Sequence, residues 1–169
     1  MKNKLFKLIV AALFAAIVFI ATFVVQIPAV FGYVNLGDCF VALCGAFLGP
    51  VYGFAAAGLG SALADLLFGF GIYAPVTFFI KGLMALLIGI SAKKGNLTIG
   101  RAICLSALGE VFMVVSYFLY ECFALGIGFA AISAVPYNAF QGVVGVVAFT
   151  VIYAIILKNK RLNEFLRLK

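Results

Sequence analysis

Histidine and tryptophan are absent from this chain of 169 residues, and only five of its residues are acidic. Without histidine the chain lacks histidine-ligated metal sites, histidine-based catalytic triads and histidine proton relays. The four cysteines, Cys39, Cys44, Cys104 and Cys122, lack the C-x-x-C spacing of metal and redox motifs. We therefore expect no catalytic residue, no metal site and no cofactor, and we expect that the protein is not an enzyme.

Charge is scarce throughout the chain. Charged residues make up 10% of the sequence and hydrophobic residues 67%, whereas soluble domains carry about 25% charged residues. The alternation of polar and apolar residues that marks a membrane β-barrel is missing. Only helices satisfy their own backbone hydrogen bonds within hydrocarbon. The composition therefore predicts an all-α integral membrane protein.

The basic residues indicate how the chain crosses the membrane. Lys81 lies apart, and the others form three groups: Lys2, Lys4 and Lys7; Lys93, Lys94 and Arg101; and Lys158, Lys160, Arg161, Arg167 and Lys169. Because short loops rich in lysine and arginine stay cytoplasmic, all three groups are expected on that side. The sequence therefore predicts one six-helix transmembrane domain over residues 1–169, with both termini cytoplasmic and helices at about 5–27, 37–48, 51–69, 75–92, 101–122 and 136–157.

The helix predicted at 37–48 is short for a membrane span. At 1.5 Å per residue it is about 18 Å long, against about 30 Å of hydrocarbon. Gly49 and Pro50 favour a turn after it. Two interpretations stay open: the hairpin formed with the next helix spans fully, or it ends at depth under the shelter of neighbouring helices.

Polar residues gather at one depth in this topology, in the outer half of the predicted bundle. A polar, partly aromatic concavity that opens outward and is closed below is typical of a capture site for an external solute, whereas a pore needs polar lining on both sides. Glu110 is the chief polar residue outside this cluster, at about mid-depth. The predicted substrate-binding residues are Asn35, Asp38, Asp65, Thr77, Lys81, Tyr117, Glu121, Asn138 and Gln141.

Asp65 and Lys81 raise a separate question, because each charge alone is costly in a bilayer. The predicted topology places them at nearly the same level on adjacent antiparallel helices, so we expect them to form an ion pair. The pair either holds the two helices together or contacts the ligand, and the sequence leaves both roles open.

Several segments carry a family resemblance. The stretches VAALFAAIVF, GYVNLGD, LGPVYGFAAAGLGSALADLL and APVTFFIKGLMALLIG resemble the substrate-binding S component of an energy-coupling factor (ECF) vitamin transporter, in the riboflavin-transporter-like group. The resemblance covers most of the chain and is strongest from about residue 31 to 90. The chain itself lacks the G-x-x-x-x-G-K-[ST] nucleotide-binding loop.

The resemblance implies a six-helix protein of the bacterial cell membrane that binds a vitamin under a roof formed by the first loop. It also implies a transmembrane coupling subunit and two cytoplasmic ATPases as partners. In the family, small residues in an A-x-x-x-A arrangement on the first helix pack on the coupling subunit. Ala11 with Ala15, and Ala12 with Ala16, match that arrangement, and alanines four apart allow close helix packing.

The substrate is less well defined by the sequence. Both signs of charge, amides and tyrosine rings suit a small polar heteroaromatic compound. In the group that the chain resembles, the compound is riboflavin, pyridoxine or a hydroxymethylpyrimidine, and the lack of tryptophan favours the smaller rings. Two other interpretations stay open: a self-sufficient secondary transporter or facilitator, which would carry flux alone, and a membrane scaffold that binds no ligand.

Overall fold

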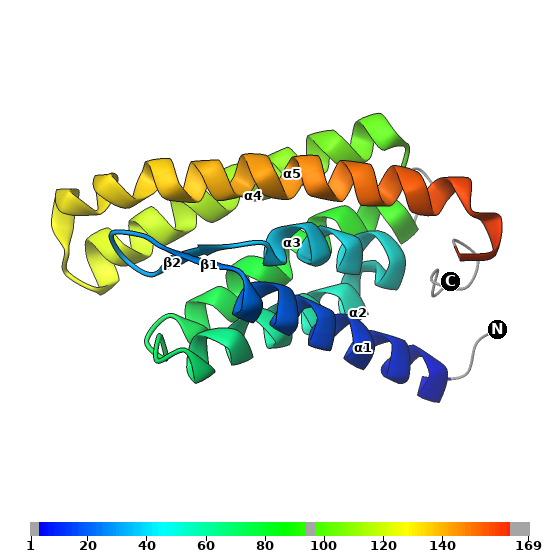
Figure 1. Cartoon of the computed structure of the whole chain (residues 1–169), viewed down its shortest axis with the longest axis horizontal. Coiled ribbons are helices and arrows are strands. Elements are labelled where there is room, and N and C mark those ends of the chain that lie inside the picture. The colour runs from blue at the N-terminus through cyan, green and yellow to red at the C-terminus, as the bar shows by residue number, and fades with distance from the viewer. Residues whose placement is uncertain (1–3, 94–96, 163–169) are drawn as a thin grey trace.

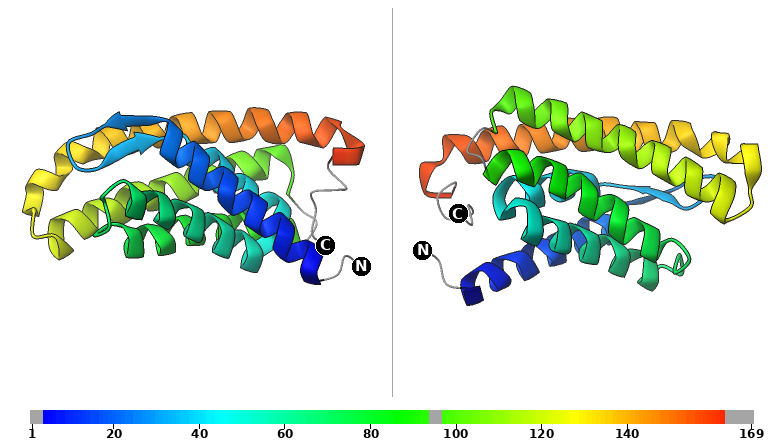
Figure 2. Two further views of the ribbon diagram at one scale, coloured as in Figure 1. Left: turned by 60° about the horizontal axis from the view of Figure 1, so that its bottom comes forward. Right: turned by 180° about the vertical axis from the view of Figure 1, so that it is seen from behind.

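The computed structural model describes residues 4–93 and 97–162, and it is all-α apart from one small β-hairpin (Figure 1). In chain order the elements are α1 (Lys4–Val24), β1 (Gln26–Pro28), β2 (Tyr33–Asn35), α2 (Gly37–Leu67), α3 (Ala74–Lys93), α4 (Ile99–Leu119), the π-helical turn η1 (Tyr120–Ala124), the 3₁₀ segment η2 (Gly128–Ala134) and α5 (Val135–Lys158). The long helices α4 and α5 lie side by side over α2 and α3, and α1 packs on α2 from the other side (Figure 2).

The first helix is shorter than predicted, and this corrects the range 5–27. α1 ends at Val24, and Gln26–Pro28 pairs with Tyr33–Asn35 as an antiparallel hairpin. The β-branched residues Val24, Val25 and Ile27 favour an extended backbone, and Pro28 disfavours a helical conformation at the residue before it. Gly32, at φ 79°, lets the chain reverse between the strands.

α2 contains two of the predicted helices, joined at a sharp kink. Gly49 has non-helical angles, φ 78° and ψ −171°, and Pro50 follows it. The two halves double back on each other, because a Cβ placed on Gly53 would lie only 2.9 Å from the Cys44 carbonyl oxygen. The described residues therefore form the six helical segments that the sequence predicts, and these make up α1 to α5 because two of the segments are the halves of the kinked α2.

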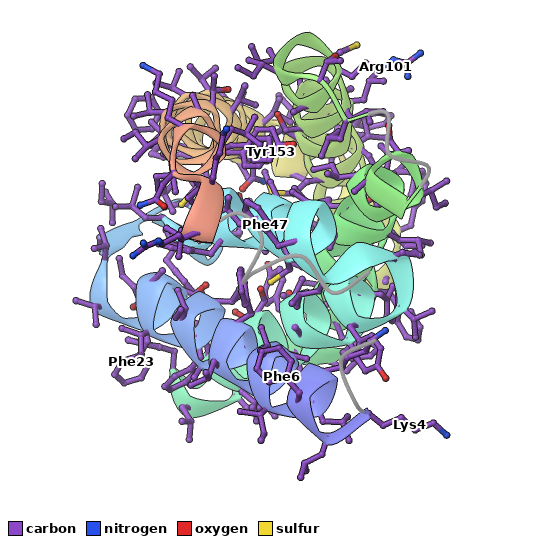
Figure 3. All side chains as sticks on the ribbon, turned by 90° about the vertical axis from the view of Figure 1, so that its right-hand side faces the viewer. Lys4, Phe6, Phe23, Phe47, Arg101 and Tyr153 are labelled. Carbon is purple, nitrogen blue, oxygen red and sulfur yellow. The ribbon has the colours of Figure 1, made fainter. Side chains whose placement is uncertain are left out.

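The first half of α2 is the centre of the bundle. Its residues from Val41 to Leu48 are all buried. The C-terminal end of this half meets α5, where the rings of Phe47 and Tyr153 lie 5.7 Å apart in the interior of the molecule (Figure 3). Neighbouring helices thus shelter the short segment, which explains how a break in the helix at Gly49 is tolerated within an apolar protein.

α3 packs closely against both halves of α2 through glycines. A Cβ on Gly45 would lie 2.2 Å from the Ala85 carbonyl oxygen, and one on Gly89 would lie 2.6 Å from the Gly49 carbonyl carbon. Because a side chain at either position would collide with backbone, small residues set the spacing of these helices, as is common where helices pack within a bilayer.

In the described part of the chain, five helices are long and apolar enough to cross a membrane, with the kinked α2 counted as one. Many large apolar side chains on them face outward, among them Leu13, Val51, Phe79, Val111 and Val143. The protein is therefore a multi-pass membrane protein. The start of α1, the end of α5 and the start of α4 lie at one end of the molecule, which gathers Lys4, Arg101 and Lys158 there (Figure 1). Lys2, Lys94, Arg167 and Lys169 lie outside the described residues.

The close contact at Gly45 predicts a selective loss of stability. Gly45→Ala should lower the free energy of unfolding by about 1–3 kcal/mol, because the added methyl group meets the Ala85 backbone and forces the helices apart. Gly100→Ala is the matched control, since a Cβ there meets nothing within 4 Å. Denaturation in mixed micelles measures both variants, and equal stability of the two would contradict the packing described for α2 and α3.

Candidate functional site

A cavity lies at the hairpin end of the bundle, opposite the end that carries the basic groups. All the predicted site residues except Asp38 line it. Its volume is about 40 Å³, which is smaller than the cavity of about 150 Å³ that accommodates benzene in an engineered protein. The lining residues are Thr22, Phe31, Gly32, Tyr33, Asn35, Ser61, Asp65, Phe70, Tyr73, Thr77, Lys81, Tyr117, Glu121, Asn138 and Gln141.

The β-hairpin covers this cavity. Residues 33 and 35 of β2 lie on the same side of the strand because side chains alternate, and both belong to the lining. Tyr33 reaches Asp65 on α2, and Asn35 reaches Gln141 on α5. The hairpin is thus fixed to both sides of the site by side-chain hydrogen bonds.

Lys81 pairs with Asp38, not with Asp65 as predicted. The Lys81 ammonium forms an ion pair with Asp38 Oδ1, and both side chains are almost fully buried, at 4% and 1% exposure. The close approach of α2 and α3, which the sequence does not reveal, decides this pairing. Because the two helices run in the same direction here and pack through Gly45, Asp38 lies nearest to Lys81.

The ion pair is the centre of a larger polar network. Gln141 Nε2 donates to Asp38 Oδ2 at 2.6 Å, and the Asn35 backbone N–H donates to Gln141 Oε1 at 2.8 Å. The Met113 sulfur of α4 lies 2.8 Å from Lys81 Nζ. The network therefore joins β2, α2, α3, α4 and α5 at one level, and it satisfies both oxygens of the buried Asp38 carboxylate.

Asp65 is held by a different partner. It accepts a hydrogen bond of 2.6 Å from the Tyr33 hydroxyl. Burial and the neighbouring Asp65 carboxylate raise the pKa of Tyr33 above its ordinary value, so the phenol stays protonated and donates. Asp65 lies in the last turn of α2, which ends in a Schellman motif. Gly69 has φ 83°, and the Phe70 N–H donates to the Asp65 carbonyl oxygen at 2.9 Å.

One face of α4 and η1 supplies two more of the residues that line the cavity, Tyr117 and Glu121. Tyr117 and Glu121 follow Met113 at helical spacing, and the Tyr117 hydroxyl lies 2.9 Å from Thr77 Oγ1. Glu121 accepts a hydrogen bond of 3.3 Å from the Tyr73 hydroxyl. It lies in the π-helical turn, where the Leu125 N–H bonds the Tyr120 carbonyl oxygen. Such turns are rare and are frequent at functional sites.

Glu110 lies behind the network and outside the lining. Its carboxyl group meets α5, since a Cβ on Gly145 would lie 2.9 Å from Glu110 Oε1 and 3.0 Å from Asp38 Cβ. Glu110 Oε2 has no hydrogen-bond partner among the described residues. The glycine at 145 therefore makes room for two buried carboxyl groups on neighbouring helices.

Part of the cavity lining was not predicted from the sequence. Thr22 and Ser61 were not selected, although each is a hydroxyl residue within a largely apolar helix. That isolation is the signal that could have identified them. Phe31 and Phe70 also line the cavity, but among 19 phenylalanines nothing in the sequence distinguishes them.

The alanines predicted to contact a partner divide into two rows on α1. Ala12 and Ala16 are exposed, whereas Ala11 and Ala15 are half-buried and pack against the core beside α2. The row of Ala12 and Ala16 is thus the one that a second protein could reach in the chain as described.

The arrangement suits binding. It places acidic, basic and uncharged hydrogen-bonding side chains together with aromatic rings around one cavity, which is the usual composition of a small-molecule site. The described residues contain no group of three or more acidic or cysteine side chains that could hold a metal ion.

Comparison with known proteins places the chain among membrane transport components. A family model described as "ECF-type riboflavin transporter, S component" matches residues 2–158. An uncharacterized protein of Pyrococcus woesei, described as lying in the gap 3′ region, is 39% identical over 93 residues, or 55% of this chain. The matched stretch spans 62% of that relative's length.

The corrected ion pair leads to a double-mutant test. Lys81→Met should lower the free energy of unfolding by about 3–5 kcal/mol, because it leaves a buried carboxylate unpaired. Adding Asp38→Asn should restore part of that loss, with a coupling energy above about 1 kcal/mol. The matched cycle with Asp65→Asn should give a smaller coupling, and a larger one would contradict the pairing seen here.

Proposed function

Because the chain belongs to the family of S components of ECF-type riboflavin transporters, we propose that it is the membrane-embedded substrate-binding subunit of an ATP-driven vitamin transporter. The observation that carries this proposal is the cavity at one end of the bundle, lined by hydrogen-bonding side chains and aromatic rings from the hairpin and the helices. A membrane protein that keeps this many polar side chains together within an apolar bundle has a use for them, since each is costly there.

The other half of the bundle supports capture over conduction. Between the ion pair and the end of the bundle that carries the basic groups, apolar and aromatic side chains fill the interior. There the ring centroid of Tyr153 lies 5.7 Å from that of Phe47 and 5.4 Å from that of Phe149. A pore would need a polar path through this region. The chain is therefore suited to receive a solute at one end and hold it.

The substrate that we propose is a small heteroaromatic vitamin or precursor: pyridoxine, a hydroxymethylpyrimidine or riboflavin. Rings of Tyr33, Tyr73 and Tyr117 can stack on such a compound, and the amides and carboxyl groups can orient it. A cavity of about 40 Å³ must widen to admit it. The hairpin is the element that we expect to move: its two strands can stay paired with each other while its hydrogen bonds from Tyr33 to Asp65 and from Asn35 to Gln141 break.

The proposed partners are an ECF transmembrane coupling subunit and two cytoplasmic ATPases, in a bacterial plasma membrane with both termini cytoplasmic. The exposed row of Ala12 and Ala16 gives a flat surface on α1 for close packing with a helix of the coupling subunit. The ATPases would supply the energy, since this chain carries no P-loop of its own.

The first test separates capture from self-sufficient transport. The purified chain should retain or bind a vitamin on its own, as detected by native mass spectrometry, and should show no uptake when reconstituted alone in vesicles. Uptake should require the coupling subunit, the ATPases and ATP. Flux through the chain alone would support a secondary transporter or facilitator, and a folded chain that binds nothing would support a scaffold.

The α1 surface gives a second test. Ala12→Leu should leave vitamin binding unchanged and reduce ATP-driven uptake at least about tenfold, because a bulky side chain prevents close packing of the coupling subunit. Ala139→Leu on α5 is the matched control, since Ala139 is also exposed and lies on another helix. Loss of binding in Ala12→Leu, or equal uptake by both variants, would count against this interface.

A further inference from the structure

The charges around the cavity do not balance. The lining contains two acidic residues, Asp65 and Glu121, and one basic residue, Lys81. Lys81 is already paired with Asp38, which lies behind the lining. The cavity therefore keeps two carboxyl groups without a basic partner among the residues that line it, and its chemistry favours a ligand that brings hydrogen-bond donors or positive charge.

Glu121 is the carboxyl group of the lining that can still accept a hydrogen bond. Its side chain is only 2% exposed, and Oε1 accepts the single hydrogen bond from Tyr73. Oε2 is buried and has no hydrogen-bond partner among the described residues. Buried polar atoms in folded proteins are nearly always paired, so an unpaired carboxyl oxygen in the wall of a cavity indicates a donor that arrives with the ligand.

Ser61 is a second lining residue with a buried polar atom that lacks a hydrogen-bond partner among the described residues. Its hydroxyl is buried on α2, one turn before Asp65. A hydroxyl can donate as well as accept. Two unpaired atoms on different elements, α2 and η1, thus mark two points of contact for one ligand.

Aromatic rings surround the Glu121 side of the cavity. The Tyr73 ring centroid lies 6.4 Å from that of Tyr117, 6.3 Å from that of Phe70 and 5.6 Å from that of Tyr120. The faces of such rings carry negative charge density and attract cationic nitrogen. A carboxyl group set among tyrosines is suited to an amino group that an aromatic ring carries directly or through one carbon atom.

We propose that the ligand is an amino-substituted heteroaromatic compound whose amino nitrogen donates to Glu121 Oε2 and whose hydroxyl group bonds Ser61 Oγ. This inference rests on the proposed capture function and narrows its substrate class. Among the three candidates it selects the hydroxymethylpyrimidine, which carries a ring amino group, over pyridoxine and riboflavin, which carry none.

A matched pair of ligands tests the inference on the unaltered chain. Pyridoxamine and pyridoxine share one ring and differ by an aminomethyl group in place of a hydroxymethyl group. Isothermal titration calorimetry at pH 7 on the full chain in detergent should show pyridoxamine binding at least about tenfold more tightly. Its ammonium group adds the attraction of opposite charges to the hydrogen bond with the Glu121 carboxylate, whereas the hydroxyl group of pyridoxine carries no charge. The hydroxymethylpyrimidine should likewise bind more tightly than riboflavin.

Glu121→Gln should abolish this preference while keeping the size of the side chain. Glu110→Gln is the control, because it removes a buried carboxyl group of α4 that does not line the cavity, and it should keep the preference. Loss of the preference in both variants would overturn the assignment to Glu121. If Glu121→Gln does not fold, the comparison of ligands on the unaltered chain still decides.

The outcomes separate this inference from the function on which it rests. Pyridoxine or riboflavin binding as tightly as the amino compounds would overturn the inference and leave the capture function standing. If none of the four compounds binds and none is retained through purification, the capture function itself fails, and the inference fails with it.

Discussion

The ion pair between Asp38 and Lys81 is the interaction on which the rest of this structure depends. Two charges buried in an apolar bundle are stable only if they meet with good geometry and further hydrogen bonds. Here Asp38 satisfies one oxygen with Lys81 and the other with Gln141. Since these residues come from α2, α3 and α5, the pairing fixes the relative depth and rotation of three helices at once.

The ion pair also divides the molecule into two halves with different roles. On one side of it, the folded helix α2 and its neighbours form a core of apolar side chains in which glycines allow backbones to approach closely. On the other side, the hairpin and the helix ends enclose a polar cavity. The hydrogen-bonding network around the ion pair separates the apolar core from the cavity. It forms a rigid wall of the binding site, because its side chains cannot rotate away without breaking their hydrogen bonds.

The site and the fold therefore share residues, which limits how either can change. Lys81, Asn35 and Gln141 line the cavity and also hold the bundle together. Tyr33 and Tyr73 are different, because each keeps a carboxyl group of the lining in place from a segment outside the helices. Burial and the nearby Glu121 carboxylate raise the pKa of Tyr73, as burial and Asp65 do for Tyr33, so both phenols act as donors.

The sequence by itself determined the membrane character of the protein and its six helical segments, and it singled out eight of the polar residues that line the cavity. These follow from hydrophobicity, chain length and the rarity of polar residues. It did not determine the partner of Lys81. Asp65 and Asp38 are both within reach of Lys81 in a topology drawn from spans alone, and the choice depends on the rotation and approach of α2 and α3 at Gly45. Tertiary structure likewise determined that the hairpin, Thr22 and Ser61 line the cavity. A hydroxyl group or a short strand becomes part of a site only when the packing of the chain turns it toward that site.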